Sequence, residues 1–300
     1  MKSALLFPGQ GTEFARCLAD WVEASGEVRR RLEFACGLLG TDVESLLARG
    51  GAALRATATG QPARTALTLG IRAEALQAGL RADCVAGHSL GEVAAWAASG
   101  ALEDTQAVEL SVCRGRVMGE AAARVAGGML ALVGAESGTV DDAIRVGSAH
   151  GIVELAAHNA PDEWVLTGEL PALDAIALRW PSRRLEVDGP WHSRLMAGAE
   201  QEFRAACSRV EAVAPATEFH VNRTGAVARD PETMADLVAG QLTRPLRWVD
   251  TIEAMDAERF LIAGPGRVLR GTVRKTLGAT ADIRVLETPA DLGALKEYQS

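Results

Sequence analysis

Short apolar runs alternate along this chain with longer stretches whose apolar residues recur three or four positions apart. Runs of the first kind predict buried strands at residues 3–7, 84–87, 129–133, 153–157, 164–167, 183–187, 260–263 and 283–286, with another near 219. Stretches of the second kind predict helices at residues 61–80, 92–99, 105–125, 140–150, 170–180, 193–210 and 231–241, with another beginning at 267. This alternation is typical of an α/β fold with a largely parallel sheet.

The order of the predicted elements changes after a pair of glycines at residues 127–128. From residue 129 to residue 187 the order reads β-α-β-β-α-β, which is the ferredoxin-like pattern. We therefore expect a small ferredoxin-like domain over residues 127–188. It would be inserted into a larger α/β domain that comprises residues 1–126 and 189–300.

Composition limits the classes of function. Hydrophobic residues make up 48% and charged residues 23% of the chain, which is typical of a globular protein. A net charge of −8 without any basic run argues against a nucleic-acid partner. We find no run of about 18 apolar residues that would span a membrane, and the N-terminal apolar run is too short for a signal peptide. Five cysteines without CxxC spacing indicate a reducing compartment, so we expect a cytoplasmic protein. We also expect it to be a monomer.

The sequence gives no sign of a metal or a cofactor. No cluster of His and Cys has the spacing of a metal site. Gly264-Pro265-Gly266 follows a predicted strand, but the chain lacks GxGxxG there, so a dinucleotide site is not supported.

The stretch Gly87-His88-Ser89-Leu90-Gly91 has the GxSxG spacing of a nucleophile elbow. A predicted strand precedes it and a predicted helix follows it, as that turn requires. The glycines allow close approach of the backbone, and the helix N-terminus directs its N–H groups at a developing oxyanion. Ser89 is therefore predicted to be a nucleophile.

A serine hydroxyl needs a base, and His192 is the best candidate because it lies in a loop before a long helix. The residue pattern alone leaves a structural role for His192 equally open. Among the other histidines, His150 is expected at an exposed helix end, His158 could line the cleft, and His220 is expected in a strand.

Two further residues have both a functional and a structural interpretation. Gln10, in the turn Pro8-Gly9-Gln10-Gly11 after the first strand, could donate a hydrogen bond to an oxyanion, or the turn could be an ordinary connection. Arg114, in the middle of a helix, could hold a substrate carboxylate with two hydrogen bonds. An arginine in a helix is more often a solvated charge.

Together these motifs resemble those of the malonyl-CoA:acyl carrier protein transacylases and of the related acyltransferase domains of polyketide synthases. The resemblance runs from Leu6 to about Glu287. It rests on eight matches in register: Gly9-Gln10-Gly11, Gln61-Pro62, Gly87 to Glu92, Arg114-Gly115 with Met118, Asn159-Ala160-Pro161, His192-Ser193 with Leu195-Met196, Gln241-Leu242 with Pro245 and Trp248, and Gly264-Pro265-Gly266 with Leu269.

The resemblance implies an α/β-hydrolase-like large domain and a role for each matched catalytic residue. Ser89 would carry the acyl group as an ester, and His192 would act as general base and acid. The peptide N–H groups of Gln10 and Leu90 would form the oxyanion hole. The backbone carbonyl of Gln241 would orient His192 and would thus take the place of the acid in a catalytic triad.

The resemblance also implies how the substrate is held. Arg114 would pair with the free carboxylate of a malonyl group, and Asn159 would contribute to substrate binding. In the family, the residue before the catalytic histidine is often Phe in malonyl-selective domains and Ser in methylmalonyl-selective ones. This chain has the bulkier Trp191, so we expect it to exclude substituents on the α-carbon.

The implied reaction is ping-pong transfer of a malonyl group from malonyl-CoA to the phosphopantetheine thiol of an acyl carrier protein. Three alternatives remain: an acyl hydrolase with the same residues, the transacylase component of a malonate decarboxylase, and a catalytically inactive docking module. Carrier proteins are usually acidic, so docking on this acidic chain requires a local basic patch. The candidates for it are Arg183, Arg184, Arg194, Arg223, Arg270 and Arg274.

Overall fold

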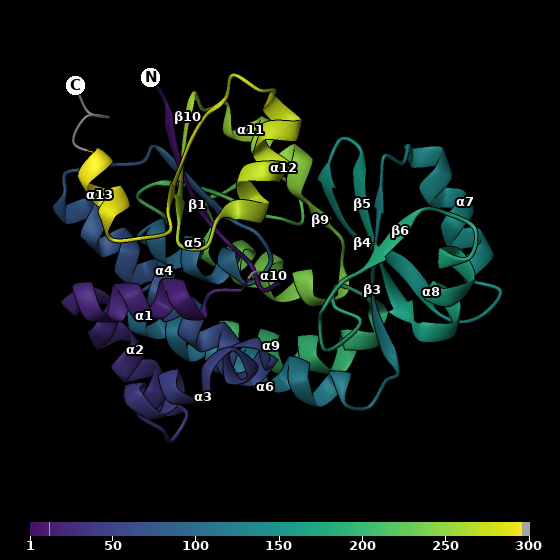
Figure 1. Ribbon diagram of the computed structural model, residues 1–300, viewed down its shortest axis with the longest axis horizontal. Coiled ribbons are helices and arrows are strands. Elements are labelled where there is room, and N and C mark those ends of the chain that lie inside the picture. Colours follow the sequence, from purple (N-terminus) through teal and green to yellow (C-terminus); the bar gives the residue numbers. More distant parts are fainter. Residues whose placement is uncertain (12, 296–300) are drawn as a thin grey trace.

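A computed structural model describes residues 1–11 and 13–295 of the chain (Figure 1). Within these residues the strands form one sheet of six strands and one sheet of five. Figure 1 shows the two sheets side by side, each with its own helices. The predicted combination of a large, mainly parallel sheet with a small inserted antiparallel sheet is confirmed.

The six-stranded sheet has the order β11-β10-β1-β2-β7-β8. Its strands are β1 (Ser3–Phe7), β2 (Cys84–Gly87), β7 (Glu218–His220), β8 (Val227–Ala228), β10 (Arg259–Ala263) and β11 (Asp282–Leu286). All neighbouring pairs are parallel except β7 with β8. The predicted strands 3–7 and 84–87 are confirmed at both ends, whereas β8 was not predicted.

The parallel arrangement brings separate chain segments to one edge of this sheet. Phe7 at the end of β1 is the register partner of Gly87 at the end of β2. The loops that follow these strands, one with Gln10 and one with Ser89, therefore start side by side. The chain that follows His220 in β7 leaves the sheet on the other side of β2. Ligands of open parallel sheets bind outside such carboxyl ends.

Helices cover both faces of the large sheet because side chains alternate along each strand. In β1, Leu5 and Phe7 pack into one apolar cluster, and Ala4 and Leu6 pack into another. The first cluster is formed with α1 (Ala15–Ala24), α2 (Gly26–Leu38), α3 (Val43–Arg55), α4 (Thr57–Gln77), α5 (Gly91–Ala98), α6 (Asp104–Ala122), α9 (Ala197–Cys207) and α10 (Pro231–Gly240). The second is formed with α11 (Trp248–Met255) and α12 (Arg267–Leu277). The chain ends with α13 (Ala290–Leu295).

The five-stranded sheet has the order β6-β3-β5-β4-β9. It consists of β3 (Gly127–Val133), β4 (Val153–Ala160), β5 (Glu163–Glu169), β6 (Ser182–Arg184) and β9 (Leu246–Arg247). The first four, with α7 (Ser137–Gly147) and α8 (Leu170–Ala177), follow the ferredoxin-like chain order predicted for this region. The fifth strand was not predicted: β9 comes from the chain far downstream and pairs parallel with β4.

Each face of the small sheet has a different partner. Leu130 and Leu166 pack against α7 and α8. Met129, Ala131 and Val165 point the other way and join the apolar cluster of the large sheet. The inserted sheet is thus packed onto the rest of the molecule by every second residue of its strands.

One predicted strand and one predicted helix differ from the structure in more than the exact position of their ends. The predicted strand 183–187 is wrong in its second half, because β6 pairs with β3 only as far as Arg184. Leu185 and Val187 instead line a cavity described below. The predicted helix 193–210 begins with a short 3-10 turn, η1 (Arg194–Met196), before α9. Among the described residues, no helix is long and apolar enough to cross a membrane.

Candidate active site

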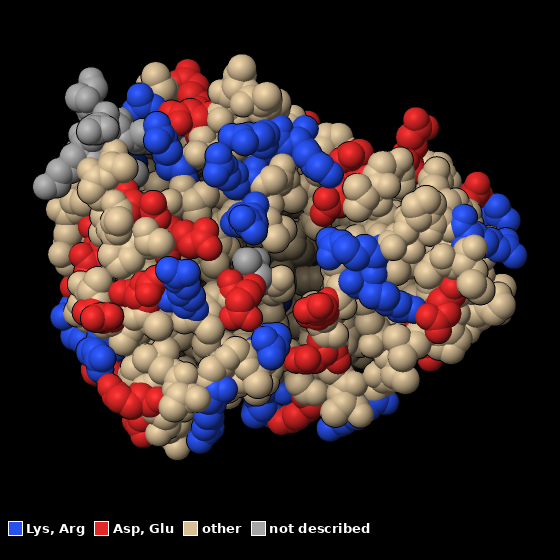
Figure 2. Space-filling view, in the orientation of Figure 1, with Lys and Arg blue, Asp and Glu red and all other residues tan. Residues whose placement is uncertain are grey.

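A cavity of about 450 Å³ lies between the carboxyl edge of the large sheet and the small sheet. Its walls come from both parts of the molecule: Ser89 and Gln10 follow large-sheet strands, and Met129 and Val165 belong to the small sheet. Figure 2 shows the molecule hollowed where these two parts meet. Arg114, Asn159, Trp191 and His192 also line this cavity.

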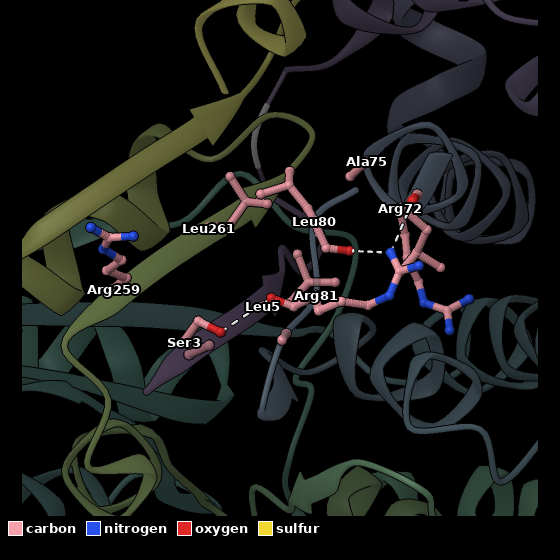
Figure 3. A pocket seen from close by; sticks show the side chains of 11 residues that line it. Ser3, Leu5, Arg72, Ala75, Leu80, Arg81, Arg259 and Leu261 are labelled. Atoms are coloured by element: carbon pink, nitrogen blue, oxygen red, sulfur yellow. Dashed lines mark hydrogen bonds between the residues drawn. The ribbon is translucent and has the colours of Figure 1, made fainter. Parts of the chain in front are cut away.

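A smaller cavity of about 50 Å³ lies near the opposite, amino ends of β1 and β10 (Figure 3). Its walls are formed by leucine, alanine and arginine residues together with Ser3, whose hydroxyl donates a hydrogen bond to the carbonyl of Arg81. No histidine or carboxylate lines it. Unlike the cavity beside Ser89, this one therefore offers no general base.

Ser89 occupies a strained turn between β2 and α5, with a φ of 53°. A side chain at this φ is uncommon outside functional turns. A Cβ at Gly87 would lie 1.9 Å from the carbonyl oxygen of Gly91, and a Cβ at Gly91 would lie 2.1 Å from that of Phe7. Both glycines of the GxSxG motif are thus required by close backbone approach.

Asn222 supports this turn and was not found from the sequence. Its side-chain oxygen accepts a hydrogen bond of 2.9 Å from the N–H of Ser89, and its side-chain nitrogen donates one of 2.7 Å to the carbonyl of Gly87. Asn222 is fully buried and follows β7, which lies next to β2. A lone asparagine after a strand carries no sequence signal for such a role.

His192 lies against the serine. Its Nε2 is 2.9 Å from Ser89 Oγ, and its Nδ1 is 2.6 Å from the backbone carbonyl oxygen of Gln241. A carbonyl can only accept, so Nδ1 carries the proton and Nε2 is free to accept the serine proton. Burial lowers the pKa of His192 to about 3, which keeps the imidazole neutral near neutral pH. The geometry is that of a nucleophile with its base.

Arg114 is buried beside the serine and is not a solvated helix charge. Only 1% of the residue is exposed, and its Nη2 donates to Ser89 Oγ at 3.2 Å. Its Nη2 also donates to Gln241 Oε1 at 3.1 Å, and its Nη1 donates to Gln61 Oε1 at 2.9 Å. Burial lowers the pKa of Arg114 to about 10, so the guanidinium stays charged at neutral pH.

The guanidinium keeps donors for a ligand. It has five N–H groups, and three of them make the hydrogen bonds to Gln61, Gln241 and Ser89. Arg114 Nε makes no hydrogen bond within the described residues. A buried cation with spare donors, next to a nucleophile, can hold an anionic group of the substrate.

The side chain of Gln10 turns away from the serine. Its Nε2 donates to the carbonyl of Arg55 at 3.2 Å and to Thr57 Oγ1 at 3.1 Å, and its Oε1 accepts from Gln61 at 3.3 Å. Only the peptide N–H of Gln10 therefore remains for an oxyanion. The other candidate, Leu90, directly precedes α5. Within residues 1–11 and 13–295, the peptide N–H groups of Gln10 and Leu90 make no hydrogen bond.

Asn159 comes from β4 of the small sheet and reaches the elbow. Its Oδ1 lies 2.8 Å from Nε2 of His88, whose ring packs edge-on against Trp248. Asn159 lines the cavity, but this oxygen is used in holding the small sheet against the elbow. His158, in contrast, stacks on Trp164 with ring centroids 3.6 Å apart.

Trp191 lines the cavity next to His192 and is 5% exposed. Its ring folds back over its own loop and lies close to Gly189. A Cβ at Gly189 would be only 2.9 Å from the ring atoms Cη2 and Cζ3. Met118 and Val187 line the cavity as well. These three side chains form an apolar part of the cavity wall.

No group of His, Cys, Asp and Glu in the described parts of the chain has the arrangement of a metal site. The chemistry that the arrangement can support is nucleophilic attack by Ser89, proton transfer through His192, and binding of an anion by Arg114.

Comparison with known proteins decides the family. The profile of the acyl transferase domain family matches residues 5–285, which is nearly the whole chain. The chain belongs to this family. It is 31% identical over 288 residues to the malonyl CoA-acyl carrier protein transacylase of Bacillus subtilis, and the match covers 91% of this chain and 90% of that protein. This likeness places the chain with the malonyl CoA-acyl carrier protein transacylases.

Solved structures agree with this placement. The chain is 32% identical to the MCAT of Streptococcus pneumoniae, with a TM-score of 0.89 over 99% of this chain and 100% of that one. It is 28% identical to a malonyl-transacylase solved in complex with a type II PKS acyl-carrier protein, with a TM-score of 0.92 and full coverage of both chains. The resemblance inferred from the eight motifs is confirmed at the level of the family.

Proposed function

We propose that this acyl transferase moves a malonyl group from malonyl-CoA to the phosphopantetheine thiol of an acyl carrier protein, through an ester on Ser89. The observation that carries the proposal is the distance of 3.2 Å between Arg114 Nη2 and Ser89 Oγ inside one cavity. A cation buried beside the nucleophile suits an acyl group that ends in a carboxylate. The named activity of the relatives supports the same substrate and partner.

In the first half of the reaction, Ser89 Oγ attacks the thioester carbonyl while its proton passes to His192 Nε2. The peptide N–H groups of Gln10 and Leu90 hold the resulting oxyanion. The carbon–sulfur bond then breaks, and His192 returns the proton to the sulfur of coenzyme A. Arg114 keeps the malonyl carboxylate in place throughout.

In the second half, the carrier thiol gives its proton to His192 and attacks the ester carbonyl. The bond to Ser89 Oγ breaks, and the serine regains a proton from His192. One base serves both directions because the two halves are the same reaction run in reverse. The carbonyl of Gln241 holds the imidazole in the required tautomer and stabilises the imidazolium while it carries the proton.

The carrier would approach along the rim of the cavity. Among the predicted arginines, three form ion pairs with acidic residues: Arg184 with Asp174, Arg194 with Glu154, and Arg223 with Asp236. The remaining three, Arg183, Arg270 and Arg274, are exposed and form no ion pair with a described residue. Figure 2 shows Lys and Arg side chains on both sides of the hollow, where an acidic carrier would be attracted.

Two further proposals concern organisation and place. We propose that the chain forms two domains, one of residues 1–126 with 189–300 and one of residues 127–188. The separate apolar cluster of Leu130 and Leu166 with α7 and α8 supports this division.

We propose that the protein acts as a monomer in the cytoplasm. The absence of any disulfide among the five free cysteines, four of them buried, supports a reducing compartment.

The proposed reaction is tested by intact-protein mass spectrometry with malonyl-CoA, with and without the phosphopantetheinylated carrier. We expect a malonyl ester on the wild type, none on Ser89→Ala, and loss of the ester to the carrier when the carrier is added. Release of free malonate at the same rate with and without carrier would show a hydrolase instead. A wild type that forms no malonyl ester would overturn the proposal.

A further inference from the structure

Glu92 is a fully buried carboxyl group close to the site, and the reaction described above assigns it no part. It lies in the first turn of α5, three residues after Ser89, and is 0% exposed. Its Oε1 accepts a hydrogen bond of 2.5 Å from the backbone N–H of Asn222, and its Oε2 accepts one of 2.5 Å from Gln241 Nε2. Burial raises the pKa of Glu92 to about 7, and the two N–H donors oppose this effect by favouring the ionised carboxylate.

Gln241 connects this carboxylate to the substrate side of the cavity. Its Nε2 donates to Glu92 and, at 3.0 Å, to the carbonyl of Ser89, while its Oε1 accepts from Arg114 Nη2. An amide has one accepting end and one donating end. Only one of its two orientations therefore satisfies Glu92 and Arg114 together.

The spacing of the charges also matters. Glu92 raises the pKa of Arg114, against the effect of burial, but the amide of Gln241 stands between the two groups. Within the described residues Arg114 forms no direct ion pair with a carboxylate. Its charge is therefore partly balanced inside the protein, and no carboxylate of the described residues takes the place of the substrate's.

We propose that Glu92 is a positioning residue: it orients the amide of Gln241 so that the amide oxygen holds Arg114 beside Ser89 for carboxylated acyl groups. The inference rests on the proposed function, because it assumes that Arg114 reads the malonyl carboxylate. Glu92 acts on selectivity only through Gln241 and touches no reacting atom.

The variant Glu92→Gln separates this role from a merely structural one. Its side chain keeps the size of Glu92 but offers one oxygen and one NH₂ group. The backbone N–H of Asn222 cannot turn, so the new amide directs its oxygen there and its NH₂ group at Gln241. Gln241 then flips to accept from it and presents its own NH₂ group to Arg114, which repels the guanidinium.

The measurement is the ratio of kcat/KM for malonyl-CoA to that for acetyl-CoA in formation of the ester on Ser89. Because both substrates meet the same enzyme, this ratio does not depend on the fraction of protein that is folded. We expect the ratio to fall roughly 10- to 100-fold in Glu92→Gln, the size of a lost hydrogen bond to a charged group. The loss should come from malonyl-CoA and mainly from its KM.

A double-mutant cycle tests whether Glu92 acts through Gln241. Gln241→Met removes the amide but keeps the backbone carbonyl that holds His192, and we expect it to lower the ratio similarly. Adding Glu92→Gln to Gln241→Met should lower the ratio no further. Ser99→Ala is the matched control, since it removes a buried hydrogen bond of 2.6 Å to the Trp96 carbonyl where α5 ends. It should lower the melting temperature and leave the ratio unchanged.

The outcomes separate the inference from the function on which it rests. If the wild type forms no malonyl ester on Ser89, the proposed function itself is refuted. Two outcomes would overturn the role of Glu92 and leave the function in place, provided that the wild type prefers malonyl-CoA. One is an unchanged ratio of kcat/KM in Glu92→Gln. The other is a double variant in which the reductions of this ratio by Glu92→Gln and Gln241→Met add fully.

Discussion

Removal of the charge of Arg114 should convert a malonyl-selective enzyme into one with little preference for a carboxylate. The perturbation is Arg114→Met, which keeps an unbranched apolar stem in a position that is 1% exposed. The variant leaves Ser89, His192 and their hydrogen bond of 2.9 Å in place. Its effect on acyl groups without a carboxylate should therefore be small.

The magnitude follows from the burial of the site. In the variant, a malonyl group would bring its carboxylate beside Ser89 without the buried cation of Arg114. Leaving one partner of a buried ion pair alone costs about 3–5 kcal/mol, which corresponds to roughly a 10²- to 4 × 10³-fold loss in kcat/KM. The side-chain oxygens of Gln61 and Gln241 also lose a buried donor, at about 1–3 kcal/mol of folding stability each.

The assay is single-turnover acylation followed by intact-protein mass spectrometry, with malonyl-CoA and acetyl-CoA in parallel. Arg116→Met is the matched control, because Arg116 lies on the same helix but is exposed and paired with Glu120 and Glu202. We expect the control to match the wild type with both substrates. If Arg114→Met lost malonyl and acetyl transfer equally, Arg114 would serve the fold or the nucleophile and not the substrate carboxylate.

Three further predictions concern other parts of the site. Burial lowers the pKa of His192 from 6.5 to about 3, so ester formation should stay nearly constant from pH 6.5 to 5, where the neutral fraction of a free imidazole would fall about 16-fold. Because the unfolded chain binds this proton near pH 6.5 and the folded chain only near pH 3, the free energy of unfolding and the melting temperature should decrease as the pH falls below 6.5. A loss of rate of about 16-fold between pH 6.5 and 5 would contradict the assignment. Trp191→Ala should raise the rate of methylmalonyl loading relative to malonyl loading by at least about tenfold, because the smaller side chain leaves space for one to two further methylene groups. Equal loading of both acyl groups by the wild type would refute the steric role of Trp191. Arg270→Glu with Arg274→Glu should raise the KM for the carrier severalfold without changing ester formation from malonyl-CoA, a split that stopped-flow of each half-reaction would reveal; an unchanged carrier KM would place docking elsewhere.

Local sequence was sufficient for the elements that depend on near neighbours. The strand at Cys84–Gly87 and the turn that follows it could be predicted because the glycines, the serine and the apolar runs all lie within ten residues. The ferredoxin-like chain order could be predicted for the same reason, since each strand and helix has its own periodicity. The edge strand β6 ended earlier than predicted, because its length is set by pairing with β3 and not by its own residues.

The match to eight motifs added roles that the pattern of residues could not supply. An arginine in a helix is normally solvated, and nothing in the residues around Arg114 indicates its burial. A backbone carbonyl that orients a histidine leaves no trace in the side chains, so the part of Gln241 could come only from the resemblance. The two-residue strand β9 is too short to have a periodicity, and it was missed.

The sequence by itself therefore determined the nucleophile, the strand-turn-helix that presents it, and the family to which the chain belongs. Only the tertiary structure decided the hydrogen-bond network around Ser89, which includes Asn222, Glu92 and Gln241. Asn222 and Gln241 each lie more than 100 residues from Ser89 in the sequence. The physical reason is that neighbouring parallel strands end at one edge of the sheet. That edge brings the chain after β7 to the elbow. Gln241 arrives there because its 3-10 turn, Gln241–Thr243, packs against α9 and α10. No spacing along the sequence records either approach.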